Sequence, residues 1–379
     1  MYLDRFSVLA TCLASALPAF GKPLLEKRAT WGPVSDSTIW SPADGFSAPG
    51  VLYARSEIIG DTLFATAENY SPEPPVFPIY TSVDQGLTWT HLSDVADTVN
   101  GWGMRYQPHL YVLKNALGTF PAGTLLVAGN SIPQDLSLTS IDLYASTDQG
   151  VTWSFVSNIA KGGRAVGVNG ETPIWEPFLM EYQGQLIIYY SDQRDPAHGQ
   201  KLVHTTSTDL LSWTPVVNDV AEVYEQRPGM ATIALMPNGE YIYFYEWGNG
   251  PSQGVPNAGY PIYYRISADP LNFLNAPAQQ LIGTDGSAPI NGSPYVVWTP
   301  SGGENGMLIV NTAADGDLYM NTNLGDPASW NRLSAGGAPS AYTRSLRVLP
   351  DPNYVLIVGA GNIGSTWNGA VRADVVQVA

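Results

Sequence analysis

The sequence has almost no cysteine and little charge. Its one cysteine, Cys12, lies near the N-terminus, and only 13% of the 379 residues are charged, with a net charge of −16 at pH 7. Because Cys12 falls in a segment that we expect to be removed, the mature chain is predicted to lack disulfides and to depend on a large hydrophobic core. Such an acidic, weakly charged chain argues against binding to nucleic acid or anionic membranes and suits an extracellular enzyme with a neutral substrate.

Motifs for binding metals, phosphates and nucleotides are also missing. No G-x-S-x-G, P-loop or dinucleotide-binding motif occurs, and GGENG and GAGNIG are typical of turns. No metal-ligand spacing links the four histidines, which are His91, His109, His198 and His204. We therefore expect neither a metal nor a cofactor.

One long apolar run is present, FSVLATCLASALPAFG, close to the N-terminus. Its length and its small residues predict a secretory signal, and Lys27-Arg28 is a candidate processing site. We expect residues 1–28 to be a signal peptide with a short propeptide, and residues 29–379 to form one catalytic domain of a secreted monomer. No other segment is apolar enough to cross a bilayer.

One phrase occurs twice, as SVDQGLTW at 82–89 and as STDQGVTW at 146–153. Weaker copies follow as STDLLSW, SADPLNF and LGDPASW. The aromatic residues that end the five copies are 64, 60, 60 and 57 residues apart, and they are Trp89, Trp153, Trp213, Phe273 and Trp330. A period of about 60 residues divides the mature chain into six units.

Each unit consists of short β-rich runs, such as FLMEY and LIIYYSD, and shows no convincing helical periodicity. Glycine and proline are abundant, at 38 and 30 residues, as chains with many turns require. Four short strands per unit, repeated radially, predict an all-β fold, a six-bladed β-propeller with four-stranded antiparallel blades. The last unit is short, so we expect the N-terminal segment around Trp40 to complete its blade.

The repeated phrase is predicted to be a turn and not the active site. Asp148 can accept hydrogen bonds from backbone N–H groups, Gly150 permits a positive φ, and Trp153 can pack in the core. The phrase resembles the Asp-box of sialidase-like proteins, S-x-D-x-G-x-T-W. That resemblance implies a position between the third and fourth strands of a blade, on the face away from the site.

The opposite face, where first strands begin and second strands end, is the predicted functional face. Prolines recur at the predicted first-strand starts, in the pairs Ala48-Pro49, Gln107-Pro108, Glu176-Pro177, Arg227-Pro228, Ser293-Pro294 and Ala338-Pro339. The predicted second strands end in polar residues, which are Glu68, Asn130, Asp192, Glu246, Asn311 and Asn362. We expect these positions to form a polar funnel at the mouth of the channel.

Two glutamates in this predicted funnel have aromatic neighbours. Glu176 lies in PIWEPF and Glu246 in YFYEWG. Aromatic rings stack on sugar faces, and two carboxylates across a channel are the minimum requirement for glycoside hydrolysis. The apolar neighbours of Glu246 favour its protonated form, as a general acid requires.

The segments GVLYARSEI, YQPHLY, WEPF, EQRPGMATIALMPNGEYIYFYE and AYTRS together resemble glycoside hydrolase family 93 over essentially the whole mature chain. The resemblance implies a six-bladed propeller, secretion, and release of arabinobiose with retention from the non-reducing end of α-1,5-linked L-arabinan. It also implies that Glu176 is the nucleophile, Glu246 the acid/base, and Tyr342 a hydroxyl partner of the nucleophile. Glu171 is the main alternative nucleophile. The expected substrate-binding residues are Arg55, Arg105, Gln107, Trp175, Asp192, Arg227, Tyr245, Ser293 and Arg344.

Two other functions share some of these features. A sialidase also has Asp-boxes and a propeller, and Arg55, Arg105, Arg227 and Arg344 could supply its arginines. However, the sequence lacks an Arg-Ile-Pro motif, because Arg55 lies in YARSE. A non-catalytic glycan-binding propeller predicts equivalent pockets in every blade, whereas the funnel residues differ between blades.

Overall fold

The structure is a computed structural model that describes residues 30–42, 50–252, 259–289, 291–313, 316–334, 341–362 and 369–379. The predicted signal segment with Cys12, and the predicted strand starts Ala48-Pro49 and Ala338-Pro339, lie outside these ranges. The described ranges contain no helix with the length and apolarity of a membrane span.

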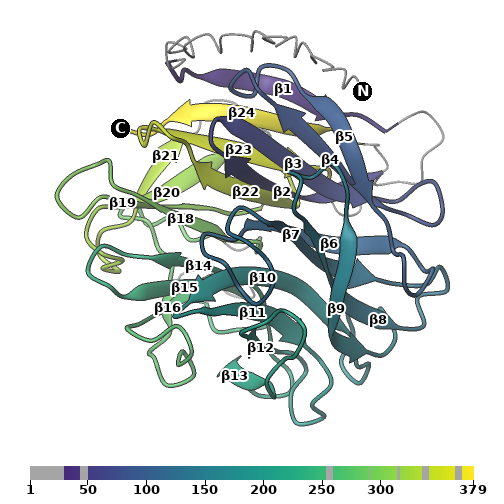
Figure 1. Cartoon of the computed structure of the whole chain (residues 1–379). Coiled ribbons are helices and arrows are strands. Elements are labelled where there is room, and N and C mark those ends of the chain that lie inside the picture. Colours follow the sequence, from purple (N-terminus) through teal and green to yellow (C-terminus); the bar gives the residue numbers. More distant parts are fainter. Residues whose placement is uncertain are drawn as a thin grey trace, which may run out of the picture. The chain divides into compact units, whose positions relative to one another are not determined.

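The described residues form six four-stranded antiparallel sheets, which are the blades of a propeller (Figure 1). Blade one consists of β2 (Val51–Ile59), β3 (Thr62–Asn69), β4 (Phe77–Ser82) and β5 (Thr90–Val95). Blade two consists of β6 (Met104–Val112), β7 (Leu125–Ser131), β8 (Thr139–Ser146) and β9 (Ser154–Gly162). Blade three consists of β10 (Ile174–Tyr182), β11 (Gln185–Asp192), β12 (Lys201–Ser207) and β13 (Val217–Val220).

The second half of the ring repeats this pattern. Blade four consists of β14 (Arg227–Leu235), β15 (Tyr241–Gly248), β16 (Ile262–Ser267) and β17 (Gln279–Gln280). Blade five consists of β18 (Tyr295–Thr299), β19 (Met307–Asn311), β20 (Asp317–Asn321) and β21 (Asn331–Ser334). Blade six consists of β22 (Thr343–Val348), β23 (Tyr354–Ala360), β24 (Val371–Gln377) and the N-terminal β1 (Val34–Trp40).

The predicted closure of the ring is confirmed. β1 pairs antiparallel with β24, with Trp40 opposite Val371 and Ser37 opposite Ala373. The first strands of neighbouring blades contact one another around the ring, so they line its centre. Middle strands such as β8 and β11 are buried along nearly their whole length, because each blade packs between two others. This double burial explains the continuous apolar run from Leu186 to Tyr190 in β11.

The first strands carry a recurrent bulge. Residues with a positive φ break the register of β2, β6, β10 and β14, and they are Tyr53 (54°), Gln107 (61°), Glu176 (61°) and Met230 (56°). Ser293 (53°) takes the same conformation just before β18. A bulge re-aims a side chain and commonly lies beside an active site.

The bulges correct one predicted register. Gln107-Pro108 and Glu176-Pro177 lie at bulges inside β6 and β10, and Ser293-Pro294 lies just before β18, whereas the sequence pattern places such pairs at strand starts. Arg227-Pro228 begins β14, as the pattern predicts, and the bulge of blade four lies three residues further on, at Met230.

The Asp-box turn of blade two lies between β8 and β9, as predicted. Both oxygens of the Asp148 carboxylate accept hydrogen bonds from Thr152, at 2.9 Å from its N–H and 2.6 Å from its hydroxyl. Gly150 has a φ of 86°. The indole N–H of Trp153 donates to Ser93 Oγ in blade one at 3.0 Å, so the box also joins neighbouring blades.

Candidate active site

A cavity of about 650 Å³ lies at the centre of the propeller, where first strands begin and second strands end. Six of the predicted site residues line it, and they are Gln107, Trp175, Glu176, Arg227, Glu246 and Tyr342. The functional face predicted from the strand pattern is therefore the face that holds the cavity.

Glu176 occupies the bulge of β10 and is buried, with 8% of the residue exposed. Its Oε2 accepts hydrogen bonds from Ser191 Oγ at 2.6 Å and from the backbone N–H of Met230 at 2.8 Å. Burial raises the pKa of Glu176 above its ordinary value, and these two hydrogen bonds oppose the rise. Glu176 is thus the better stabilised carboxylate of the site.

Glu246, near the end of β15, is the more easily protonated acid. Its Oε2 accepts a hydrogen bond from the backbone N–H of Ser293 at 2.8 Å. Burial, followed by the negative charge of Glu176, raises the pKa of Glu246 from its ordinary 4.5 to about 8. At neutral pH Glu246 therefore carries a proton that it can donate.

Gly229 defines the gap between these two acids. A Cβ atom at Gly229 would lie 3.3 Å from Glu176 Oε2 and 3.3 Å from Glu246 Oε1. Because both oxygens lie that far from one point, the distance between them is at most twice that value. The two carboxyl groups are therefore close neighbours in the cavity.

A third carboxyl group, that of Glu68, lies in the same cavity. The Tyr70 hydroxyl donates to Glu68 Oε2 at 2.5 Å, and the backbone N–H of Gln107 donates to its Oε1 at 2.8 Å. Burial raises the pKa of Glu68 to about 7 despite these hydrogen bonds. Gln107 connects Glu68 to the catalytic pair, because its side-chain oxygen accepts the backbone N–H of Glu176 at 3.0 Å.

Aromatic rings line the cavity from blade one to blade three. The ring centroids of Tyr70 and Tyr106 are 5.9 Å apart, and those of Tyr106 and Trp175 are 6.4 Å apart. Tyr342 lies in blade six, and its ring is 6.5 Å from that of Tyr53. Within the described residues, Glu176 receives no hydrogen bond from Tyr342, which differs from the predicted partnership.

Arg227 joins three segments at the wall of the cavity. Its guanidinium donates to Asn169 Oδ1 at 2.8 Å, to Gln193 Oε1 at 2.9 Å and to Gln200 Oε1 at 2.9 Å. Asn169 belongs to the loop between β9 and β10, so Arg227 fixes that loop against blade three.

Three of the predicted substrate-binding arginines lie outside the cavity lining. Arg55 is buried and contacts the Tyr53 ring, with 4.0 Å between its guanidinium carbon and the ring centroid. Arg105 forms a bidentate ion pair with Glu73, with both contacts at 2.8 Å. Arg344 is buried and donates to a backbone carbonyl at 2.7 Å. These contacts hold the fold together.

Three other predicted site residues also differ from expectation in their placement. Asp192 pairs with Arg194 at 2.7 Å, whereas the preceding residue, Ser191, faces Glu176. Tyr245 is fully buried in the hydrophobic core, because its neighbour Glu246 takes the cavity side of the strand. Ser293 reaches the site through its backbone N–H.

Glu171, the alternative nucleophile, lies in the loop before β10 and does not line the cavity. Its carboxylate is 3.9 Å from Arg164, and its side chain is 34% exposed. Eight lining residues are absent from the predicted site, namely Leu52, Glu68, Tyr70, Tyr106, Gly167, Gln200, Tyr260 and Asn291. Glu68 had a visible signal as a predicted strand end, but the loop residues had none.

Two buried carboxyl groups with unequal pKa values, facing each other beside aromatic rings, define a glycoside hydrolase site. Among the described residues, no cluster of three or more His, Cys, Asp or Glu side chains is arranged to hold a metal ion.

Comparisons with known proteins support this class. No protein-family model and no curated protein matches the chain, whereas solved structures do. The α-L-arabinofuranosidase Arb93A of Fusarium graminearum, in complex with an iminosugar inhibitor, is 48% identical, with a TM-score of 0.89, over 91% of this chain and 98% of that chain. The same Fusarium enzyme, described as a GH93 α-L-arabinofuranosidase, was also solved with arabinobiose and matches with a TM-score of 0.87.

The α-L-arabinanase of Penicillium chrysogenum, complexed with arabinobiose, is 46% identical, with a TM-score of 0.85, over 92% of this chain and 99% of that chain. The NanB sialidase of Streptococcus pneumoniae matches at only 9% identity with a TM-score of 0.60, which shows a shared fold alone. The chain belongs to glycoside hydrolase family 93.

Proposed function

We propose that the protein is a secreted, exo-acting α-1,5-L-arabinanase that releases arabinobiose from the non-reducing end of arabinan with retention of configuration. The observation that carries the proposal is the close opposition of Glu176 and Glu246 around Gly229. The substrate class follows from relatives at 46–48% identity, whose structures were solved with arabinobiose.

The spacing of the two acids supports retention. Inverting glycosidases leave about 6.5–9.5 Å between their carboxyl groups for a water molecule, whereas retaining enzymes keep them about 5–5.5 Å apart. Both facing oxygens lie 3.3 Å from one position at Gly229, so their separation is at most twice 3.3 Å, which excludes all but the lower edge of the inverting range. Direct attack by Glu176 on the anomeric carbon fits this gap.

The first chemical step uses the two acids together. Glu176, ionised and stabilised by Ser191 and Met230, attacks the anomeric carbon and forms an ester bond as the glycosidic C–O bond breaks. Glu246 transfers its proton to the departing oxygen, which leaves as a hydroxyl of the shortened arabinan.

The second step regenerates the enzyme. Glu246, now ionised, removes a proton from a water molecule that attacks the same anomeric carbon from the side vacated by the leaving group. The ester bond to Glu176 breaks, and the product leaves with its original anomeric configuration. Each carboxyl group thereby returns to its starting protonation state.

The wall that contains Arg227 supports exo action. Gly167, in the loop between β9 and β10, lines the cavity beside Trp175. Asn169 in this loop receives a hydrogen bond from Arg227 and donates one to the carbonyl of Tyr224 at 2.7 Å. A loop held from both sides closes that end of the cavity, so that only a chain terminus enters.

Secretion is proposed from the N-terminal apolar run and from the acidic, weakly charged composition. It is tested by determining where the full-length chain accumulates and what its first residue is.

One experiment tests the proposed activity and its chief alternative. The protein is incubated in parallel with linear α-1,5-arabinan and with sialyl-lactose, and the products are separated by chromatography and followed by proton NMR. We expect arabinobiose with the α-anomer appearing first, and no release of sialic acid. A β-anomer as first product contradicts the double displacement, and release of sialic acid contradicts the substrate.

A further inference from the structure

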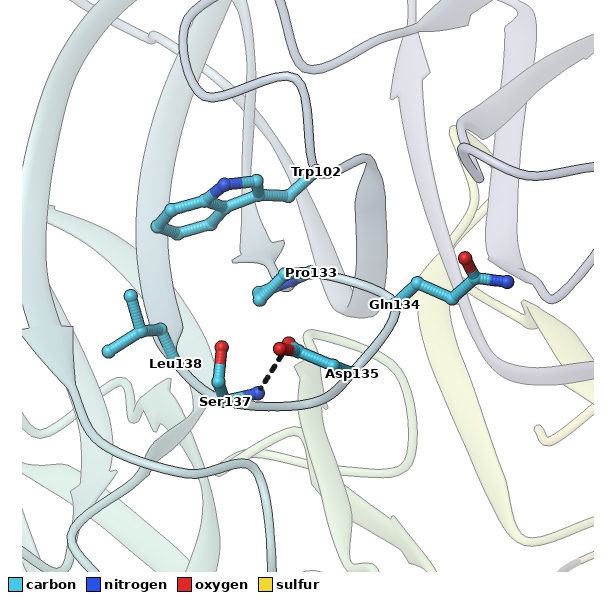
Figure 2. A pocket seen from close by; sticks show the side chains of 6 residues that line it. All are labelled: Trp102, Pro133, Gln134, Asp135, Ser137 and Leu138. Carbon is cyan, nitrogen blue, oxygen red and sulfur yellow. Dashed lines mark hydrogen bonds between the residues drawn. The ribbon is translucent and has the colours of Figure 1, made fainter.

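A second hollow, of about 680 Å³, lies on the active-site face in blade two (Figure 2). The indole ring of Trp102 forms one side of it, and Pro133, Ser137 and Leu138 form the other. Trp102 precedes β6, and the turn at 133–138 connects β7 to β8, so both belong to the end of the blade that holds the cavity.

Both sides of the hollow are held by internal hydrogen bonds. The Asp97 carboxylate accepts the backbone N–H groups of Asn100 at 2.8 Å and Trp102 at 2.9 Å. On the opposite side, Asp135 accepts the N–H of Ser137 at 3.0 Å. The N–H of Ile132 donates to the carbonyl of Gly103 at 3.2 Å and joins the two loops. The hollow is therefore formed before any ligand arrives, which lowers the entropic cost of binding.

The lining of the hollow matches a neutral sugar. It combines an indole ring and Leu138, which is 43% exposed, with the polar side chains of Gln134, Asp135 and Ser137. Aromatic faces stack on the apolar faces of sugars, and amide, carboxylate and hydroxyl groups hydrogen-bond to their hydroxyls. The lining has a carboxylate and neither lysine nor arginine, so it disfavours phosphates and other anions.

The hollow is connected to the catalytic cavity through packed side chains. Ile132 and Leu136, from the turn beside the hollow, cluster with Ala165 and with Trp175. The N–H of Ala165 also donates to the carbonyl of Leu136 at 2.8 Å. Trp175 lines the cavity beside Glu176, so this cluster of packed side chains connects the two spaces.

We propose that this hollow is a second binding site for arabinofuranosyl units, which holds a distal part of an arabinan chain, or a neighbouring chain, while a chain end occupies the catalytic cavity. This inference rests on the proposed function of that cavity. It assigns to Trp102 the role of a stacking platform for polymeric substrate, with no part in bond cleavage.

The test compares a long and a short substrate. Trp102→Ala, Trp102→Phe and Leu138→Ala are assayed on long linear arabinan and on arabinotriose, whose three units are all taken up around the scissile bond when arabinobiose is released. Leu211→Ala is the control, because Leu211 is 56% exposed in an Asp-box turn on the opposite face. We expect Trp102→Ala to raise KM for long arabinan about five- to tenfold, with kcat and the arabinotriose constants unchanged, and Trp102→Phe to retain most of the affinity.

Each outcome decides the matter. Unchanged KM values on both substrates in Trp102→Ala and Leu138→Ala overturn the second site. An equal rise in KM on both substrates also overturns it, because the Trp102 ring then affects the catalytic cavity through the side chains packed against Trp175. If Trp102→Ala fails to fold, Leu138→Ala carries the same comparison. A wild-type protein that cleaves neither substrate refutes the proposed function, and the inference falls with it.

Discussion

Met230 donates its backbone N–H to Glu176 across a blade boundary at 2.8 Å, and Ser293 donates in the same way to Glu246 at the next boundary. Both donors have a positive φ, Met230 at the bulge of β14 and Ser293 just before β18, so the same backbone conformation serves both acids. Glu176 receives an additional hydrogen bond from Ser191, at 2.6 Å. That extra donor stabilises negative charge on Glu176 and leaves the proton of the pair on Glu246.

This asymmetry predicts separable roles for the two acids. Glu246→Ala should lower kcat on arabinan about 100- to 10,000-fold, yet keep activity on an aryl arabinoside whose leaving group needs no proton. Added azide should rescue that variant and give a product of retained configuration. Glu176→Ala should be inactive on both substrates, and azide should give the inverted product.

Glu171→Ala serves as the control for this assignment, because Glu171 lies outside the cavity lining. It should keep wild-type kcat within about a factor of three, as surface substitutions usually do. If Glu171→Ala gives the inverted azide product and Glu176→Ala stays active, the nucleophile is Glu171.

The raised pKa of Glu246 predicts the alkaline limb of the pH profile. Activity should fall as the pH rises through about 8, because Glu246 then loses the proton that it donates. The negative charge of Glu176 contributes to that high pKa, so Glu176→Gln should lower the pKa of Glu246. Carbon-13 NMR titration of the glutamate carboxyl groups measures both values. A Glu246 pKa that stays the same in Glu176→Gln contradicts the electrostatic coupling.

The same shift predicts a change in stability with pH. The pKa of Glu246 is about 8 in the folded protein and about 4.5 in the unfolded chain, so the folded state binds the proton more tightly. Its favourable contribution is complete below pH 4.5 and is lost as the pH rises through 8. The Tm of the wild type relative to that of Glu246→Gln should therefore fall between about pH 5 and pH 9. Parallel melting curves contradict this prediction.

Gly292 lies beside the general acid at a position where we expect any added side chain to reduce activity. A Cβ at Gly292 would lie 2.2 Å from Glu246 Oε2, and the residue has a φ of 77°. Gly292→Ala should displace the Glu246 carboxyl group and lower kcat on arabinan more than on an aryl arabinoside. Gly286→Ala is the matched control, because Gly286 has a φ of 81° and open space around its Cβ position. Equal losses in both variants assign the effect to backbone strain.

The sequence predicted the blades because the Asp-box leaves a strong local signal. Ser146, Asp148, Gly150 and Thr152 form hydrogen bonds with one another within one turn, so the spacing that forms the turn is visible in the sequence. Glu176 was also predictable, because a proline follows its bulge, as it does after Gln107 and Ser293.

Other site residues could not be placed because side chains alternate along a strand. A shift of one residue moves a side chain to the opposite face, so Ser191 takes the position that was predicted for Asp192. The contact of Arg105 with Glu73 leaves no pattern in the sequence, since it joins a strand to a distant loop. Tyr260 reaches the cavity from a loop, where no periodicity indicates direction.

We expect the Asp-box of blade two to contribute to the stability of the fold and not to substrate binding. Asp148→Ala removes the acceptor for both donors of Thr152, on the face away from the cavity. The variant should melt at a lower temperature than the wild type, while the KM of the folded fraction stays unchanged. Asp61→Ala, in an exposed hairpin turn, is the control. A large change in KM with an unaltered Tm contradicts a purely structural role for the box.

We expect exo action to depend on the hydrogen bonds by which Arg227 holds the loop between β9 and β10. Arg227→Met keeps the length of the side chain but removes its hydrogen bonds to Asn169, Gln193 and Gln200, so the loop between β9 and β10 loses one of its attachments. Early products from linear arabinan should then include chains longer than arabinobiose, which chromatography resolves. Asn169→Ala should shift the products in the same direction, because it removes the loop's side of the contact. Arg194→Met, which breaks an ion pair with Asp192 outside the cavity, should not shift them. An unchanged product pattern with a raised KM instead shows that Arg227 binds the substrate directly and that another segment closes the cavity.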